Sequence, residues 1–284
     1  MLGCRFYNPA RRPGKRSAVQ FARNEFTDFA DYSTRRGIRS TKSDETRLTT
    51  FRVPSYSRIS ASVNLRSRHL KMSLTLYLLR HGQTALSRDD VFCGSGLDPE
   101  LTPEGLQMAR AFATAYKTKP WRAIYSSSLK RGIATAQPLC DDLGVTLQAR
   151  ADLNEIGYGK WEGQTRADVA REYHDDYISW LADPAWHAPT DGELAITIAR
   201  RSLRVIDEIR CQFDDGNILI VSHKATIRII LCSLLGIDVG RFRYRLGCPV
   251  GSISVIEFSL EGPLLHSLAD RSHLSESLRA LPGT

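Results

Sequence analysis

The chain has 284 residues, of which 42% are hydrophobic, enough for the core of one large domain or two small ones. Its apolar runs are short and none approaches the roughly 18 residues of a membrane-spanning helix, so no membrane association is expected. The net charge of +8 comes entirely from residues 1–71, which carry 16 Lys and Arg against 5 Asp and Glu. The remaining residues carry 23 basic and 26 acidic side chains, a balance that gives no support to nucleic-acid binding by the folded part.

The first 71 residues predict a disordered basic extension. They are rich in Arg, Ser and Thr and hold few aliphatic side chains, so burial cannot offset the entropy lost on ordering. Three interpretations stay open: a start codon assigned too far upstream, a cleaved organelle-targeting segment, and a basic interaction arm. We favour the first over targeting, because Met72 directly precedes the first strand-like run.

The six cysteines are scattered, without a CxxC pair or a closely spaced histidine. This spacing is typical of reduced thiols rather than of a disulfide framework or a zinc site. The basic extension has no apolar signal region, so secretion is not expected. We therefore expect a cytoplasmic protein, with targeting to an organelle through residues 1–71 as the alternative.

From Met72 onward, apolar runs alternate with helical patterns. Residues 74–79 are strand-like, and a helix is predicted over 101–117, with Thr102 at its N-cap and Pro103 at its first position. The other predicted strands cover 123–127, 145–149, 217–223, 251–258 and 264–268. The other predicted helices cover 128–144, 166–182, 194–213 and 226–236.

This alternation predicts an α/β fold with a three-layer, mostly parallel sheet and helices on both faces. A helical lid is expected before the strand over 217–223. In its first helix Tyr173, Tyr177 and either Trp180 or Leu181 share one face, which we expect to be core rather than ligand contact. The expected organisation is the extension over 1–71, a folded domain over 72–270 and a C-terminal tail over 271–284.

Polar side chains gather at the carboxyl ends of the predicted strands. Arg80 and His81 end the first strand, Arg131 follows the second, and His223 ends a later buried strand. Glu155 lies in the loop after the short third strand. Each position alone is ordinary for a polar residue, but adjacent parallel strands would bring all five to one edge of the sheet. Ligands bind at that edge in such folds.

This set of side chains fits phosphoryl transfer. Two guanidiniums bind phosphate oxygens through charge-assisted bidentate hydrogen bonds. One neutral imidazole can attack phosphorus, and a second, protonated beside the anion, can stabilise the transition state. A carboxylic acid can protonate the leaving oxygen and then, as the carboxylate, activate water. The sequence has neither a Walker loop nor an acidic metal cage, so we expect no metal and no cofactor.

At these residues the chain resembles the histidine phosphatase (phosphoglycerate mutase-like) superfamily. "LLRHGQT" contains its RHG motif, and "SSSLKRGIATA" is similar to its second-arginine helix. "LNEIGYGKWEG" resembles its acid/base segment and "VSHKATIR" its second-histidine motif. The likeness covers residues 74–258, with the motifs in the expected order.

The resemblance implies a role for each matching residue. His81 would accept the phosphoryl group and become phosphohistidine, with Glu155 as the proton donor. The catalytic residues implied are His81, Glu155, His223, Arg80 and Arg131. The substrate-binding residues implied are Arg80, Arg131, His223, Gln83 and Thr84.

Three positions depart from the family pattern. Ser87 stands where an asparagine often contacts the phosphate. Gly132 replaces the usual alanine, at a cost to the helix of about 1 kcal/mol. Lys224 and Ala225 replace a glycine-rich pair after the second histidine, which leaves the substrate preference open.

We therefore expect a metal-independent phosphomonoesterase that acts on a small phosphorylated metabolite. His223 lies 68 positions after Glu155, an interval that fits the compact phosphatases of the family better than its mutases. Mutase-type phosphoryl transfer and a catalytically silent phosphate-binding scaffold stay open as alternatives. Neither a nucleic acid nor a membrane is expected as a partner. Some relatives pair through sheet edges, so a homodimer is an open expectation.

Overall fold

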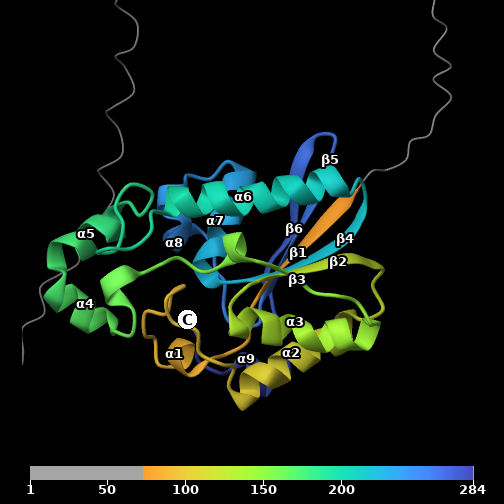
Figure 1. Cartoon of the computed structure of the whole chain (residues 1–284), viewed down its shortest axis with the longest axis horizontal. Coiled ribbons are helices and arrows are strands. Elements are labelled where there is room, and N and C mark those ends of the chain that lie inside the picture. The colour runs from red at the N-terminus through yellow and green to blue at the C-terminus, as the bar shows by residue number, and fades with distance from the viewer. Residues whose placement is uncertain (1–72, 284) are drawn as a thin grey trace, which may run out of the picture. The chain divides into compact units, whose positions relative to one another are not determined.

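A six-stranded sheet forms the centre of the computed structural model, which describes residues 73–283 (Figure 1). The strand order is β3-β2-β4-β1-β5-β6. The strands are β1 (Leu74–Arg80), β2 (Trp121–Ser127), β3 (Gln148–Arg150), β4 (Gly216–Ser222), β5 (Ile253–Ser259) and β6 (Gly262–Asp270). The first four are parallel, and β5 and β6 form an antiparallel hairpin beside β1. The predicted mostly parallel α/β class is confirmed, while the extension over 1–71 lies outside the described residues.

Helices cover both faces of the sheet, as Figure 1 shows. One face carries α2 (Pro103–Tyr116) and α3 (Lys130–Leu143), and the other carries α6 (Ala195–Gln212) and α7 (Lys224–Leu235). Successive side chains of a strand point to opposite faces, so the two layers are packed by neighbouring residues. Leu79 of β1 joins a buried cluster that includes residues of α2 and α3. Leu78 joins the cluster that includes residues of α6 and α7.

The helix boundaries follow the capping residues of the sequence. The Thr102 hydroxyl accepts from the backbone N–H of Gly105 at the start of α2, as predicted. Gly144, with φ 65°, ends α3 in the left-handed conformation. The start of α3 differs from the prediction, since it begins at Lys130 rather than at residue 128. The Ser128 hydroxyl instead donates to the side chain of Asn154.

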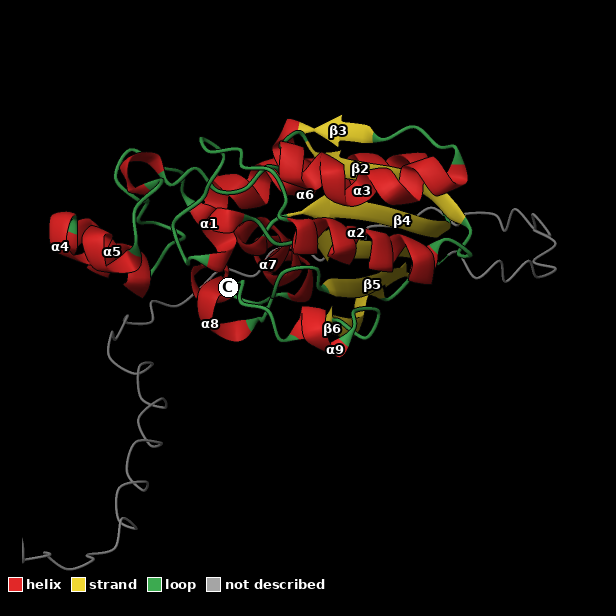
Figure 2. Cartoon of the chain, turned by 90° about the horizontal axis from the view of Figure 1, so that it is seen from below, coloured by secondary structure: helices red, strands yellow, loops and turns green. Residues whose placement is uncertain are grey.

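Two short helices take the place of the single lid helix predicted over 166–182. The chain breaks at Tyr173 (φ −127°) into α4 (Arg166–Glu172) and α5 (His174–Ala182), which lie beyond one end of the strands (Figure 2). Trp180 is 2% exposed and packs with Phe92 and Trp161, and the half-buried Tyr173 and Tyr177 pack against this cluster. The predicted aromatic core of the lid is present, but Trp180 also lines the cavity described below, so for this residue the expectation of core alone is wrong.

The remaining elements are short. They are α1 (Ala85–Arg88), α8 (Phe242–Arg245), α9 (Glu276–Arg279) and three 3-10 helices over Ala151–Leu153, Gly159–Trp161 and Val239–Arg241. The segment after β6 packs on the domain, because Leu274 and Leu278 are buried against Met108 of α2.

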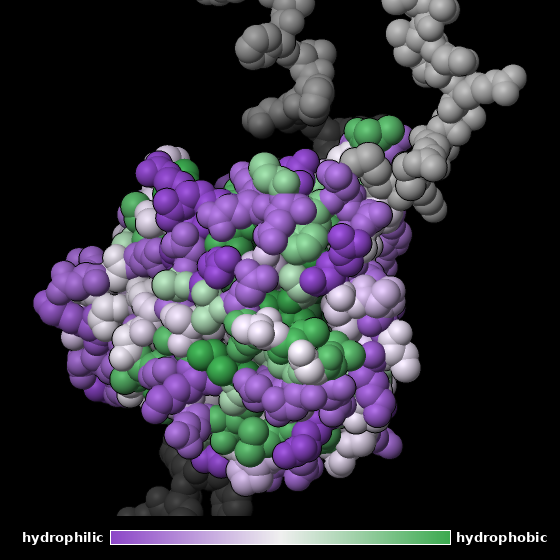
Figure 3. Space-filling model, turned by 45° about the vertical axis from the view of Figure 1, so that its right-hand side comes forward, coloured by the Kyte–Doolittle hydropathy of each residue, from purple (hydrophilic) through white to green (hydrophobic). Residues whose placement is uncertain are grey.

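The surface carries both hydrophilic and apolar residues (Figure 3). On the face shown in Figure 3, hydrophilic residues predominate around the periphery and apolar residues gather toward the centre. β6 forms one edge of the sheet and exposes Leu264 and Leu268. An open edge of this kind can pair with a second copy, and the homodimer stays a prediction. None of the helices within residues 73–283 combines the length and the apolar character needed to cross a membrane.

Candidate active site

The two histidines meet because their strands are neighbours. β1 pairs with β4 in parallel register, Arg80 opposite Ser222, so His81 and His223 leave the sheet side by side. The backbone N–H of His81 extends the ladder by donating to the carbonyl of Ser222 at 3.0 Å. The two imidazole ring centroids lie 5.0 Å apart. The convergence expected at this edge of the sheet is present.

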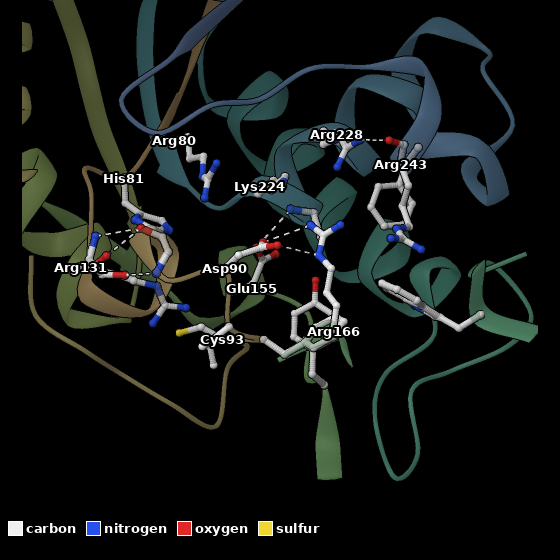
Figure 4. Close-up of a pocket in the computed structure, with 18 of the residues that line it drawn as sticks. Arg80, His81, Asp90, Cys93, Arg131, Glu155, Arg166, Lys224, Arg228 and Arg243 are labelled. Atoms are coloured by element: carbon white, nitrogen blue, oxygen red, sulfur yellow. Dashed lines mark hydrogen bonds and ion pairs between the residues drawn. The ribbon is translucent and has the colours of Figure 1, made fainter. Parts of the chain in front are cut away.

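His81 is held in one tautomer. Its Nδ1 lies 2.8 Å from the carbonyl oxygen of Gly82, which can only accept, so Nδ1 carries the proton. The lone pair is then on Nε2. Burial, followed by the charges of Arg131 and Arg80, lowers the pKa of His81 well below its ordinary value (Figure 4). His81 is therefore a neutral imidazole at physiological pH, the form that can act as a nucleophile.

Both arginines are fixed by backbone carbonyls. Arg131 is 1% exposed, and its Nη1 and Nη2 donate to the carbonyls of Leu97 and Gly94, each at 2.9 Å. Arg80 Nη1 donates to the carbonyl of Cys248 at 2.7 Å. These acceptors come from loops far away in the sequence, so the guanidiniums are oriented by the folded domain rather than by their own strands and helices.

Gly132 allows α3 to approach the end of β2. A Cβ at this position would overlap the Ser127 hydroxyl, which lies 2.8 Å from Nε2 of His223. The departure from the family's alanine thus has a local steric reason. Burial, followed by Arg131 and His81, lowers the pKa of His223 well below its ordinary value. The site without a ligand consequently favours the neutral form of His223.

Glu155 lies at the N-terminus of α7. It is 5% exposed, and its two oxygens accept from the backbone N–H groups of Ala225 (3.1 Å) and Thr226 (3.2 Å). A third backbone donor is its neighbour Ile156, at 3.1 Å. The helix dipole favours a negative group at this place. The carboxylate is therefore oriented by the same helix that begins directly after His223.

A cavity of about 270 Å³ opens over these residues and is lined by Arg80, His81, Thr84, Arg131 and Glu155 from the predicted set. Gln83 does not line it. Its side-chain amide donates to the carbonyl of Pro282 at 2.6 Å and accepts from the Thr102 hydroxyl at 3.0 Å. His223 is fully buried beside His81 and does not line the cavity either.

Thr84 and Ser87 form hydrogen bonds with each other. Their side chains and backbone N–H groups form a reciprocal capping box at the start of α1. Both residues line the cavity. Ser87, in the place of the family's asparagine, thus uses its hydroxyl to fix the loop after His81.

Four further cations line the cavity, and the sequence draws attention only to Lys224 among them. They are Arg166, Lys224, Arg228 and Arg243. Lys224 and Arg228 are four residues apart on α7, so their shared helical face was a usable signal. Arg166 and Arg243 come from the lid and from α8, and no motif marked them. Arg166 Nε pairs with Asp90 at 3.0 Å.

Metal ligands do not gather at this site. Among the described residues, no group of three or more His, Cys, Asp or Glu side chains lies in a position to hold a metal ion. The polar groups that face the cavity are mainly cationic, which suits an anion.

The buried histidines predict a loss of stability in mild acid. Because the pKa values of His81 and His223 are lowered in the folded state, the unfolded state binds more protons below about pH 6.5. Stability should be intact above that pH and fall by about 1.4 kcal/mol per pH unit for each histidine below it. Urea unfolding at several pH values between 7.5 and 5 measures this slope.

The matched variants are His223→Gln, which should show a shallower decline, and His174→Ala, which removes an exposed histidine of α5. His174→Ala should keep the wild-type slope. Equal slopes for the wild type and His223→Gln would contradict the prediction.

The sequence and the fold of this chain are similar to those of known proteins. The family model described as "Histidine phosphatase superfamily (branch 1)" matches residues 76–271. Phosphoserine phosphatase 1 of Hydrogenobacter thermophilus is 28% identical over 201 residues, which are 71% of this chain and 94% of that protein. The adenosylcobalamin/alpha-ribazole phosphatase of Salmonella typhimurium is 29% identical over 178 residues, 62% of this chain and 88% of that protein. The solved structure of mycobacterial glucosyl-3-phosphoglycerate phosphatase has a TM-score of 0.64 at 25% identity, covering 70% of this chain and 100% of that one.

Proposed function

The chain belongs to the histidine phosphatase superfamily, and from this membership and the site geometry we propose that it hydrolyses small phosphomonoesters through a phosphohistidine, without a metal ion. The observation that carries the proposal is the state of His81. Its Nδ1 proton is held by the carbonyl of Gly82, and its Nε2 lone pair is available beside the Arg80 and Arg131 guanidiniums. A neutral nucleophile next to two anion-binding groups is the arrangement that phosphoryl transfer to nitrogen requires.

In the first step, the Nε2 lone pair of His81 attacks phosphorus while the bond from phosphorus to the ester oxygen breaks. Glu155, in its acid form, gives its proton to that leaving oxygen, and the alcohol departs. In the second step, water attacks the phosphohistidine and the P–N bond breaks. Glu155, now a carboxylate, takes the proton from the water, so that inorganic phosphate forms and the enzyme returns to its starting state.

The charge of the transition state would be stabilised by Arg80, Arg131 and His223. The arginines are already oriented by backbone carbonyls, so little reorganisation is needed when charge develops. Ser127 holds the Nε2 side of His223, while the buried Nδ1 has no partner among the described residues. The negative charge of a phosphate bound at His81 would favour the protonated ring of His223.

Phosphomonoester hydrolysis should survive exhaustive dialysis against EDTA, because the arginines and His223 supply the positive charge that a metal would otherwise provide. Vanadate should inhibit, since its five-coordinate form resembles the transition state. Both results can be read from p-nitrophenyl phosphate turnover.

Activity that is lost in EDTA and returns with Mg²⁺ would overturn the metal-independent mechanism. A protein that binds phosphate but turns over no ester would instead be the silent scaffold.

A further inference from the structure

The cavity has more positive charge than one phosphate needs. Six cations line it: Arg80, Arg131, Arg166, Lys224, Arg228 and Arg243. Only two carboxylates, Asp90 and Glu155, line it with them. Asp98, which does not line the cavity, pairs with Arg131 at 3.5 Å and reduces the excess of positive charge from four to three, more than a single phosphate dianion neutralises. The remaining charge lies beyond Lys224 as seen from His81, on the side formed by α7 and α8 (Figure 4).

Three of these cations are not paired with any carboxylate among residues 73–283. They are Lys224, Arg228 and Arg243. Arg166 differs, because it is held by Asp90. Arg131 is likewise paired, with Asp98 at 3.5 Å. Lys224, Arg228 and Arg243 are therefore cations of the wall that a ligand could pair with.

Arg228 and Arg243 each have a buried N–H donor without a hydrogen-bond acceptor among the described residues. Arg228 is only 8% exposed; its Nη2 donates to the backbone carbonyl of Arg243, and its Nε has no partner in the described part of the chain. Nη1 of Arg243 is also buried without a partner there. Buried donors without acceptors are costly, and their presence in a cavity wall indicates a group that an anionic ligand would satisfy.

Aromatic contacts hold both arginines in place. The guanidinium carbon of Arg243 lies 3.8 Å from the ring centroid of Trp180, and that of Arg228 lies 5.4 Å from the ring centroid of Phe242. Such contacts orient guanidinium planes without using up their N–H donors. The two side chains are thus fixed before a ligand arrives.

Lys224 lies between Arg228 and the part of the cavity formed by Arg80 and His81 (Figure 4). Burial, followed by the charges of Arg80 and Arg228, lowers the pKa of its ammonium to about 8. The side chain is still mostly charged at neutral pH but lies among like charges, a state that a neighbouring anion would stabilise.

We propose that Lys224, Arg228 and Arg243 bind a second anionic group of the substrate, while the scissile phosphate lies between His81, Arg80 and Arg131. The inference rests on the proposed phosphatase function and adds the substrate class to it. The substrate is a compact metabolite, because the cavity holds only about 270 Å³. It carries a phosphomonoester at one end and a carboxylate or second phosphate a few atoms away.

A three-carbon series tests this directly: propyl phosphate, 3-(phosphonooxy)propanoate and propane-1,3-diol bisphosphate. The wild-type kcat/KM should be about 10- to 100-fold higher for one or both of the two-anion compounds than for propyl phosphate, as expected of hydrogen bonds to charged groups. The compound with the larger gain shows whether the second group is a carboxylate or a phosphate.

Variants of Lys224 test whether this residue causes the higher kcat/KM for the two-anion compounds. The quantity to compare is the kcat/KM of the better two-anion compound divided by that of propyl phosphate. This ratio should fall by about tenfold in Lys224→Met and should be largely kept in Lys224→Arg. The matched control is Arg245→Gln, which removes the same charge from α8 at an exposed position outside the cavity wall. That variant should keep the wild-type ratio.

The inference and the proposed function can fail separately. Equal kcat/KM values across the series, with p-nitrophenyl phosphate hydrolysed normally, would overturn the second-anion site and leave the phosphatase proposal standing. An unchanged ratio in Lys224→Met would also overturn the assignment.

If no ester is hydrolysed at all, calorimetric binding of the same three compounds to the His81→Ala protein decides the inference. Tighter binding of a two-anion compound, lost on adding Lys224→Met, would support the site. Equal affinities would overturn it.

Discussion

Replacing His81 by alanine is expected to lower kcat by on the order of 10⁵–10⁶-fold, as the loss of a covalent nucleophile does in other enzymes. No other group of the site can take over. Burial raises the pKa of Cys93, the thiol in the cavity wall, to about 11, so it stays protonated. Nε2 of His223 is already held by Ser127.

The wild type, quenched during turnover of a ³²P-labelled ester, should carry an acid-labile and base-stable label on His81, as a phosphoramidate does. His81→Ala should carry none, and His174→Ala, which removes an exposed histidine, should retain full labelling and turnover. Substantial turnover by His81→Ala, or a label on His223 or Cys93, would refute the assignment of the nucleophile.

Glu155→Gln should separate the two chemical steps. An alkyl phosphate needs a proton on its leaving oxygen, so its hydrolysis should fall by roughly 10²–10⁴-fold, the usual contribution of general acid–base catalysis. p-Nitrophenolate leaves with little help, so phosphorylation of His81 by the nitrophenyl ester should be relatively spared. The second step still lacks its base. The variant should therefore accumulate phosphohistidine from the nitrophenyl ester and not from the alkyl ester.

The amide of a glutamine can match only one of the two acceptor oxygens that face Ala225 and Thr226, so a thermal melt must accompany the kinetics. Glu172→Gln, at an exposed carboxylate of α4, serves as the control and should behave as the wild type. If Glu155→Gln hydrolyses alkyl phosphates at the wild-type rate, the acid is another group. Asp90 is then the residue to test, because it is the other carboxylate that lines the cavity.

Much of the fold follows from local patterns. Continuous apolar strands alternating with helices predict the parallel sheet, and Thr102 and Gly144 mark helix ends that the structure reproduces. Where local signals compete, the sequence is less informative. The helical pattern over 166–182 continues through Tyr173, but the structure breaks there, and its aromatic face packs around Phe92 and Trp161.

In the candidate site, too, some residues follow from local patterns and others are placed by contacts with distant parts of the chain. The carboxyl ends of parallel strands lie at one edge of the sheet, and this alone predicts that His81, His223 and the two arginines come together. Main-chain pairing determines where the strands end. The orientation of Gln83 away from the cavity depends on a carbonyl about 200 residues later in the chain, which no local pattern encodes. Arg243 likewise reaches the cavity through its contact with Trp180 of the lid.

The pairing of β1 with β4 has a consequence for how this site can change over time. Backbone hydrogen bonds, not side chains, set the separation of His81 and His223. Aliphatic residues of either strand can therefore be exchanged for others of similar volume at modest cost, while the two imidazoles keep their places. Deleting one residue from the middle of β4 would invert the faces of the residues that follow it in the strand and shift His223 away from His81, because side chains alternate along a strand. Sequences of this kind can diverge freely in which residues build the two strands, but the number of residues in each strand is constrained.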